Sequence, residues 1–195
     1  MLNKDILISS LQKLYEEAKK LHDEFNEADG KIGDGDLGIT ILNGFEEINN
    51  NINKFSDDIG ANFTICSQAF VKKSGSSFGT LIAFSFMNIS KSLKGKKECN
   101  HEDIISIFET ALKTIQERGK SKLGDKTIVD SLDLIIKKLK DNANYPEVFK
   151  SATKQALEDF KGKKILIGRA RMFEDKTKDL DDPGMFALNK LSEAF

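Results

Sequence analysis

Hydrophobic residues recur at intervals of three and four along nearly the whole chain, which is the spacing of amphipathic helices. The first such stripe runs from Ile6 to Phe25. The other stripes lie at residues 41–52, 61–73, 80–93, 104–115, 127–139, 148–160 and 183–195. The stripe at 80–93 is apolar on nearly all sides, which is typical of a buried helix. The pattern therefore predicts eight helices.

Capping residues mark several helix boundaries. Asn100 or His101 is suited to cap the helix that follows, and Gly119 is suited to a position just beyond its C-terminus. Pro183 is expected in the first turn of the last helix. Residues 163–173 are ambiguous between strand and helix, and no other segment has a convincing strand pattern.

Composition narrows the class of protein. The chain has 30 basic and 31 acidic side chains and a net charge of −1, which provides no electrostatic basis for binding nucleic acid or an anionic membrane surface. No apolar run is long enough to span a bilayer, and the N-terminus has no secretory signal. Cys66 and Cys99 fit no metal-ligand spacing, so reduced thiols and a cytoplasmic location are expected. We expect residues 1–195 to form a single all-α domain.

The first of four unusually polar loops, DGKIGDGDLG, carries Asp29, Asp34 and Asp36 with glycines between them. These carboxylates would repel one another unless a cation lay between them, and oxygen ligands on a flexible backbone suit a hard divalent ion. A calcium EF-hand is excluded because its bidentate glutamate is missing from the required position. A solvated turn with helix-capping aspartates is the alternative.

Three further loops are rich in glycine, serine or arginine. Residues 73–80, KSGSSFGT, would leave backbone amides and hydroxyls free for phosphate oxygens, although an ordinary serine cap is the simpler explanation of this loop alone. Residues 118–127, RGKSKLGDKT, form either a site loop or a helix-to-helix turn. Residues 168–184 contain Arg169 and Arg171, two of only three arginines in the chain. Arginine supplies a fixed, forked donor for phosphate or carboxylate, and chance placement at a surface turn is the alternative.

Taken together and in this order, the four loops resemble those of the nucleotide-binding L subunit of dihydroxyacetone kinases, the DhaL or Dak2-type domain. That family places magnesium on a D-x-x-x-x-G-D-x-D-H-G loop, phosphate at a GG[AS]SG loop and nucleotide beside an RGKxxxGDKTM segment, and it closes the site with a KGRA…DPG segment. This chain has DGKIGDGDLG, SGSSFG, RGKSKLGDKTI and IGRARMFEDKTKDLDDPG, spread over residues 29–184. The resemblance implies an eight-helix antiparallel barrel with the nucleotide site in loops at one end.

Residue by residue, the resemblance implies a metal site and a nucleotide site. Asp29, Asp34 and Asp36 would hold a pair of Mg²⁺ ions. Arg169 would contact the nucleotide and act in catalysis. The other residues implied to bind ADP or ATP are Leu37, Gly38, Ile39, Thr40, Ser76, Ser77, Gly119, Ile128, Asp182, Pro183 and Gly184.

Several positions depart from the family pattern. Leu37 replaces a histidine, which removes a polar phosphate contact, and Thr40 replaces an asparagine. Phe78 intrudes in the serine loop, and RMFEDKTKD replaces the usual SYLGERS segment. These departures indicate a divergent member with a different sugar or phosphate donor.

The resemblance implies a kinase component that binds magnesium with ADP or ATP and transfers a phosphoryl group to a small keto-sugar held by a separate K subunit. The nucleotide would either exchange as ATP or be recharged by a phosphohistidine-bearing protein of the sugar phosphotransferase system. His22 and His101 lie outside the four loops and are expected at solvated helix positions, so a substrate-handling histidine would belong to the K subunit. The alternative is a nucleotide-sensing module that regulates a transcription factor, which Leu37 favours and the retained Asp34 and Asp36 oppose.

Overall fold

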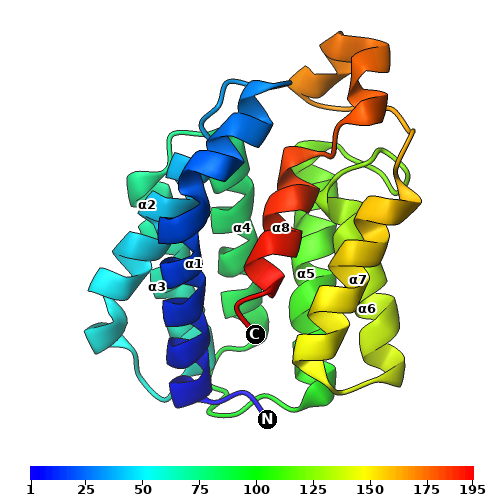
Figure 1. Ribbon diagram of the computed structural model, residues 1–195. Coiled ribbons are helices and arrows are strands. Elements are labelled where there is room, and N and C mark those ends of the chain that lie inside the picture. Colours follow the sequence, from blue (N-terminus) through cyan, green and yellow to red (C-terminus); the bar gives the residue numbers. More distant parts are fainter.

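The computed structural model describes all 195 residues, and its eight α-helices run alternately up and down (Figure 1). They are α1 (Lys4–Gly30), α2 (Leu37–Asn50), α3 (Ile59–Lys73), α4 (Ser77–Ser92), α5 (His101–Gly119), α6 (Ile128–Asp141), α7 (Tyr145–Asp159) and α8 (Pro183–Ser192). Two 3₁₀ segments, η1 (Ile52–Lys54) and η2 (Arg169–Asp179), lie in the connections. Each helix contacts the next along the chain, and α8 contacts α1, so the helices close into a ring. The predicted all-α, eight-helix antiparallel barrel is confirmed.

The connections between helices alternate between the two ends of this barrel. Because successive helices are antiparallel, every second connection returns to the same end. The α1–α2, α3–α4, α5–α6 and α7–α8 connections therefore lie together at the top of Figure 1, with η2 outermost. These four connections are the four polar loops, and the up-and-down topology is what brings them together.

The buried apolar side chains form four groups, and the two largest contain most of these residues. The larger group has 19 buried residues, mostly on α1 to α4 and α8, and includes Phe25, Phe45 and Phe70. The Phe45 and Phe70 rings pack edge to face, with their centroids 5.6 Å apart. The second group joins α6 to α7 through Ile135, Leu139, Val148 and Ala152. Fully burying one such side chain stabilises the fold by about 1.5–3 kcal/mol, so these stripes hold the helices in register.

Several helix ends differ from the sequence-based expectation. Helix α1 continues to Gly30, so Asp29 lies in its last turn rather than in a loop. At the start of α5 the expectation holds, because Asn100, one of the two candidates, is the cap. Gly119 is the last residue of α5, and Lys120 takes the left-handed conformation (φ 56°) that a glycine usually adopts after a helix.

Residues 163–173 form neither a strand nor an α-helix. The chain is irregular up to Gly168 and then enters η2, which is interrupted by a kink at Glu174 (φ 45°). The only buried residues in this stretch are Ile165 and Ala170, which pack with Ile32 in a small cluster under η2. With so few buried contacts, no continuous helical face is anchored to the barrel.

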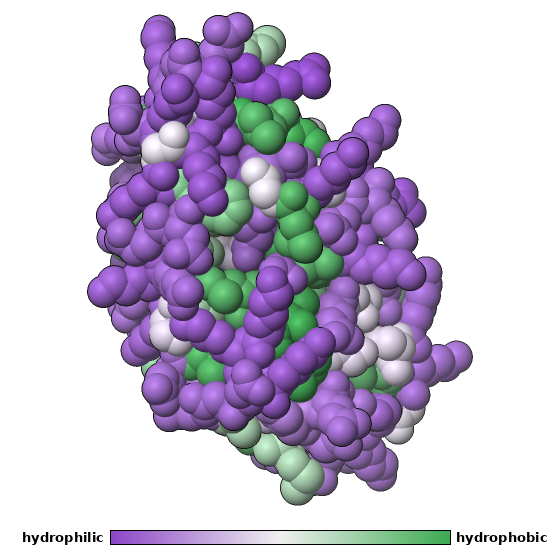
Figure 2. All heavy atoms as spheres, turned by 90° about the vertical axis from the view of Figure 1, so that its right-hand side faces the viewer, coloured by the Kyte–Doolittle hydropathy of each residue, from purple (hydrophilic) through white to green (hydrophobic).

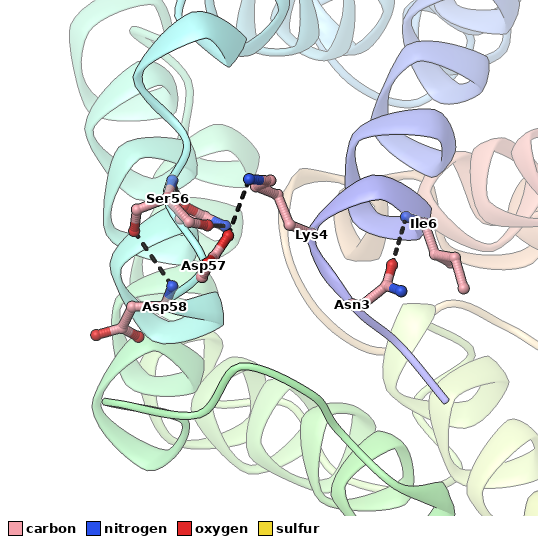
Figure 3. Close-up of polar contacts among 7 residues, drawn as sticks. Asn3, Lys4, Ile6, Ser56, Asp57 and Asp58 are labelled. Carbon is pink, nitrogen blue, oxygen red and sulfur yellow. Dashed lines mark hydrogen bonds and ion pairs between the residues drawn. The ribbon is translucent and has the colours of Figure 1, made fainter.

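The end of the barrel opposite the four loops is held by short-range polar contacts (Figure 3). Asn3 caps α1 by accepting from the Ile6 amide at 3.0 Å. Lys4 Nζ lies 2.9 Å from Asp57 Oδ1, which ties the start of α1 to the α2–α3 connection. Water reaches both side chains of this pair and screens its attraction, so it contributes little to stability.

The outer surface is mostly polar. Viewed from the side of α6 and α7, it is largely hydrophilic, with apolar atoms visible mainly in a narrow stripe (Figure 2). None of the helices combines the length and hydropathy that a bilayer crossing requires. Cys66 and Cys99 are buried and unpaired.

The two histidines lie outside the four loops, as expected, but both ring nitrogens of His101 have protein partners. Its Nε2 lies 2.8 Å from the Leu139 carbonyl oxygen and its Nδ1 lies 3.0 Å from the Tyr145 hydroxyl. His101 is partly exposed and is held beside the α6–α7 connection, so it is less free than the sequence suggested.

Candidate functional site

A cleft of about 820 Å³ opens at the loop end of the barrel. Residues from all four polar loops line it, together with side chains from α4 and α5. This volume falls in the range of small-molecule and cofactor sites, roughly 300–1,000 Å³. The cleft is therefore large enough for a nucleotide.

Three carboxylates converge at one side of the cleft. Asp29, Asp34 and Asp36 each offer one oxygen, and the three oxygens lie within 4.8 Å of one another. Asp29 Oδ2 also accepts from the backbone amides of Gly35, at 2.7 Å, and Asp36, at 3.2 Å. Gly35 has a positive φ of 73°, which suits glycine and lets the loop fold back over the end of α1.

The charges in this cluster are only partly balanced. Burial raises the pKa of Asp36 above its ordinary value, and the neighbouring charges of Asp34 and Asp29 raise it further. Arg169 opposes this shift and forms an ion pair with Asp34. Three converging carboxylates with one guanidinium beside them match the hard oxygen ligands of Mg²⁺. The residues present therefore fit this metal.

The first amides of α2 have a protein partner. Asn26 Oδ1, from α1, accepts from the Gly38 amide at 2.7 Å and the Ile39 amide at 3.1 Å. The Thr40 hydroxyl donates to Ser76 Oγ at 2.9 Å, which ties the first loop to the second. Sequence reasoning did not identify Asn26, because a cap supplied by a neighbouring helix has no local signature.

The serine loop both caps a helix and lines the cleft. Ser76 Oγ accepts from the Gly79 amide at 3.1 Å and is the N-cap of α4. Ser76, Ser77 and Phe78 all lie on the cleft wall. The capping explanation and the phosphate-site explanation are therefore compatible at this loop.

Apolar side chains from α4 and α5 form another part of the cleft lining. Leu81 and Phe84 from α4 line this part together with Ile115, and Arg118 places its guanidinium carbon 3.8 Å from the centre of the Phe84 ring. Ser121 also lines the cleft, and its buried hydroxyl has no hydrogen-bond partner. Sequence reasoning did not select these residues, although Arg118 begins the RGK motif and is one of only three arginines.

Asp182 lies where the fourth loop meets α8. Its Oδ1 accepts from the Met185 amide at 2.9 Å, which caps the helix. Burial raises the pKa of Asp182 to about 7, and the backbone amides at the helix start and the charge of Lys126 only partly offset that effect. Asp182 therefore combines a capping role with an environment that disfavours its charge.

The cleft brings most of the predicted site residues together. Its lining includes Asp29, Asp34, Asp36, Leu37, Ser76, Ser77, Gly119, Ile128, Arg169, Asp182, Pro183 and Gly184. Three predicted residues, Gly38, Ile39 and Thr40, lie outside the lining. Gly38 and Thr40 are buried, and Ile39 is exposed. Their proposed contact with phosphate stays a prediction.

Known proteins resemble the chain along nearly its whole length. The DAK2 domain matches residues 31–195. The chain is 27% identical over 193 residues to "PEP-dependent dihydroxyacetone kinase 1, ADP-binding subunit DhaL" of Listeria innocua, covering 98% of this chain and 95% of that protein. It is 26% identical to "PTS-dependent dihydroxyacetone kinase, ADP-binding subunit DhaL" of Lactococcus lactis, covering 94% and 92% of the two chains.

A solved structure shares the fold. The dihydroxyacetone kinase from C. freundii, in complex with AMP-PNP and Mg²⁺, superposes with a TM-score of 0.77 at 20% identity. The match covers all of this chain and 34% of that one, so this chain spans about a third of the solved kinase. Since the domain match includes all but the first 30 residues, this chain belongs to the DAK2 domain family and is of the DhaL type.

Proposed function

We propose that this chain is the ADP- and ATP-binding subunit of a dihydroxyacetone-type kinase and that residues 1–195 act as one domain in this role. It would transfer a phosphoryl group to a small keto-sugar held by a separate K subunit. The observation that carries the proposal is the cleft itself, whose lining combines the converging carboxylates and Arg169 with apolar side chains from α4 and α5. A nucleotide has the same combination, with charged phosphates at one end and a flat base at the other.

The carboxylates would serve the phosphate end. Asp29, Asp34 and Asp36 would hold a pair of Mg²⁺ ions, which supply positive charge to phosphate oxygens when bound. Ser76 and Ser77 would donate hydroxyls to phosphate oxygens at the start of α4, where the helix end also favours negative charge. Arg169 would offset the charge that develops on the transferred phosphoryl group.

The apolar side chains of the lining would hold the base. Leu81 and Ile128 pack against the same apolar group around Ile115, and Gly119 lies beside Leu81. The Arg118 guanidinium lies over the Phe84 ring. The unpartnered Ser121 hydroxyl is available to a polar edge of the base. Asp182, Pro183 and Gly184 would close over the nucleotide from the start of α8.

The phosphoryl donor distinguishes two versions of this proposal. The relatives in Listeria innocua and Lactococcus lactis carry the names PEP-dependent and PTS-dependent, which favours a bound nucleotide that a phosphohistidine-bearing phosphotransferase protein recharges. In the other version ATP exchanges freely. Incubating the purified chain with labelled ATP and measuring the exchange rate of bound nucleotide would separate them, because a recharged cofactor exchanges slowly.

A second function is a nucleotide-sensing module that regulates a transcription factor. It is favoured by Leu37, a buried side chain on the cleft wall where the family has a histidine. Loss of that polar contact would weaken catalysis more than binding. Such a module would bind Mg-nucleotide but support no sugar phosphorylation with any K subunit.

Titration calorimetry with Mg-ADP tests the proposal. Asp34→Asn should weaken binding at least tenfold, which corresponds to about 1.4 kcal/mol, because a metal ligand loses its charge. The fold should survive because like charges are relieved. Glu46→Gln, on the exposed face of α2, is the control and should bind like the natural chain. Equal Mg-ADP affinity of Asp34→Asn and the natural chain would refute the metal assignment.

A further inference from the structure

Arg169 sits on a loop that has little packing of its own. We define the arginine loop as residues 163–177, between the end of α7 and the last part of η2. Arg169 is exposed, lines the cleft and forms an ion pair with Asp34 there. Since only three residues of the loop, Ile165, Ala170 and Thr177, are buried, its position depends on how its two ends are held.

Lys126 lies between those two ends. Its ammonium donates to the Lys163 carbonyl oxygen at 2.9 Å and to the Thr177 carbonyl oxygen at 3.0 Å. These acceptors are the first and last residues of the arginine loop. One side chain from the α5–α6 connection therefore closes the base of a loop that belongs to the α7–α8 connection.

Neighbouring hydrogen bonds connect the same two segments of the chain. Thr177 Oγ1 accepts from the Ile165 amide at 3.0 Å and donates to the Glu174 carbonyl oxygen at 2.7 Å. The Leu166 amide donates to the Asp125 carbonyl oxygen at 3.1 Å, next to Lys126 in the chain. These hydrogen bonds join the two ends of the arginine loop to each other and join the loop to the GDKT segment.

The environment of Lys126 is unusual for a lysine. The residue is 1% exposed, and its backbone takes a left-handed conformation (φ 60°) that costs free energy for any residue with a side chain. Burial lowers its pKa, whereas the nearby charges of Asp181, Asp182 and Asp179 raise it. A buried ammonium on a strained backbone persists only where the surrounding contacts compensate for both costs.

We propose that Lys126 is a positioning residue that clasps the two ends of the arginine loop and so holds Arg169 beside Asp34 at the cleft. The inference rests on the proposed function only in the role that it gives Arg169. Lys126 does not line the cleft and acts through Arg169. The clasp itself is a property of the folded chain and needs no ligand.

Limited trypsin digestion without nucleotide tests the clasp directly. Lys126→Met keeps an unbranched side chain, one heavy atom shorter, at the same backbone conformation, but it removes the ammonium. Cleavage after Arg169 and Arg171 should then become at least tenfold faster than in the natural chain. Lys120→Met is the matched control, because Lys120 lies in the same connection, has a similar φ of 56° and is exposed. It should leave cleavage at both sites unchanged.

Mg-ADP affinity provides a readout that general loosening of the fold would not reproduce. Lys126→Met and Arg169→Ala should each weaken binding several-fold, and the double variant should be no weaker than Arg169→Ala alone. Equal trypsin cleavage rates in Lys126→Met and Lys120→Met, or affinity losses that multiply in the double variant, would overturn the proposal.

A second pair of variants covers the case in which Lys126→Met fails to fold. Thr177→Val removes the hydroxyl that joins the ends of the arginine loop, and Thr177→Ser retains it. Cleavage after Arg169 should be faster in Thr177→Val and near the natural rate in Thr177→Ser; equal rates would count against the clasp. If the natural chain binds no nucleotide, the proposed function fails, and the digestion still decides whether Lys126 holds the loop.

Discussion

At the scale of single residues, carboxylates with the same chemistry have different surroundings in the cleft. Asp34 is half-exposed and pairs with Arg169, whereas Asp182 is shielded at the start of α8. Desolvation raises the pKa of Asp182 to about 7, with Lys126 opposing the shift and Asp130 adding to it. Burial therefore makes the charged form of Asp182 unfavourable near neutral pH.

This difference predicts a pH dependence of stability. Asp182 binds its proton more tightly in the folded chain (pKa about 7) than in the unfolded chain (about 3.9), so its contribution to stability is greatest in acid and falls as pH rises. The loss should occur between about pH 4 and pH 7, reach at most about 4 kcal/mol, and level off above pH 7. Asp182→Asn retains a helix cap and should lack this component.

Urea unfolding of both proteins between pH 4.5 and pH 8 measures the effect. The stability of the natural chain relative to Asp182→Asn should decline across this range. Parallel profiles for the two proteins would show that Asp182 is ionised in the folded chain.

At the scale of elements, the position of α2 depends on a close approach to α1. Gly38 lies against the α1 backbone, and a Cβ at this position would come within 1.8 Å of the His22 carbonyl oxygen. The same approach lets Asn26 accept from the first amides of α2. Asp36 directly precedes α2, so this packing also determines where one of the candidate metal ligands lies.

Gly38→Ala should therefore destabilise the protein by about 2–3 kcal/mol, because two helix backbones must separate to admit one methyl group. Gly75→Ala is a control, since a Cβ there meets nothing within 4 Å. It should change the free energy of unfolding by less than about 1 kcal/mol. Thermal or urea unfolding of both variants measures the difference, and similar stabilities would contradict the tight packing of α1 against α2.

At the scale of the whole molecule, the cleft contains groups suited to phosphate and a base but no group suited to activate a sugar. Neither histidine lines it, and the three clustered aspartates are committed to metal in the proposed function. A phosphate holder of this kind needs a partner that binds the acceptor. The chemistry is accordingly expected to be divided between two proteins.

The purified chain with MgATP and dihydroxyacetone should therefore form no sugar phosphate. Activity should appear on addition of the cognate K-type subunit, with the phosphoryl donor that the pair uses. A coupled assay for dihydroxyacetone phosphate measures both conditions. Robust turnover by the isolated chain that survives His22→Ala and His101→Ala would show that the proposed division is wrong.

The helices and their loops could be predicted from the sequence because their causes are local. Apolar residues at intervals of three and four specify a helical face whatever the rest of the chain does, and eight such stripes became eight helices. The aspartates, serines and arginines were visible because four loops concentrate them. Helix ends are harder to predict. Gly119 was expected just beyond α5, but it is the last residue of that helix and Lys120 follows it.

Tertiary structure decided how distant residues meet. Asn26 caps a helix 12 residues away, Arg118 covers a ring on another helix, and Lys126 closes a loop that begins 37 residues later. Residues 163–173 could not be assigned to a helix or a strand, because neither the helical nor the strand spacing of apolar residues dominates there. Their path follows contacts with other parts of the chain. Local periodicity thus determined the helices. The shape and charge balance of the cleft arose only when the up-and-down packing brought alternate connections to one end. The sequence could not show this, because contacts between distant residues leave no periodic signal in it.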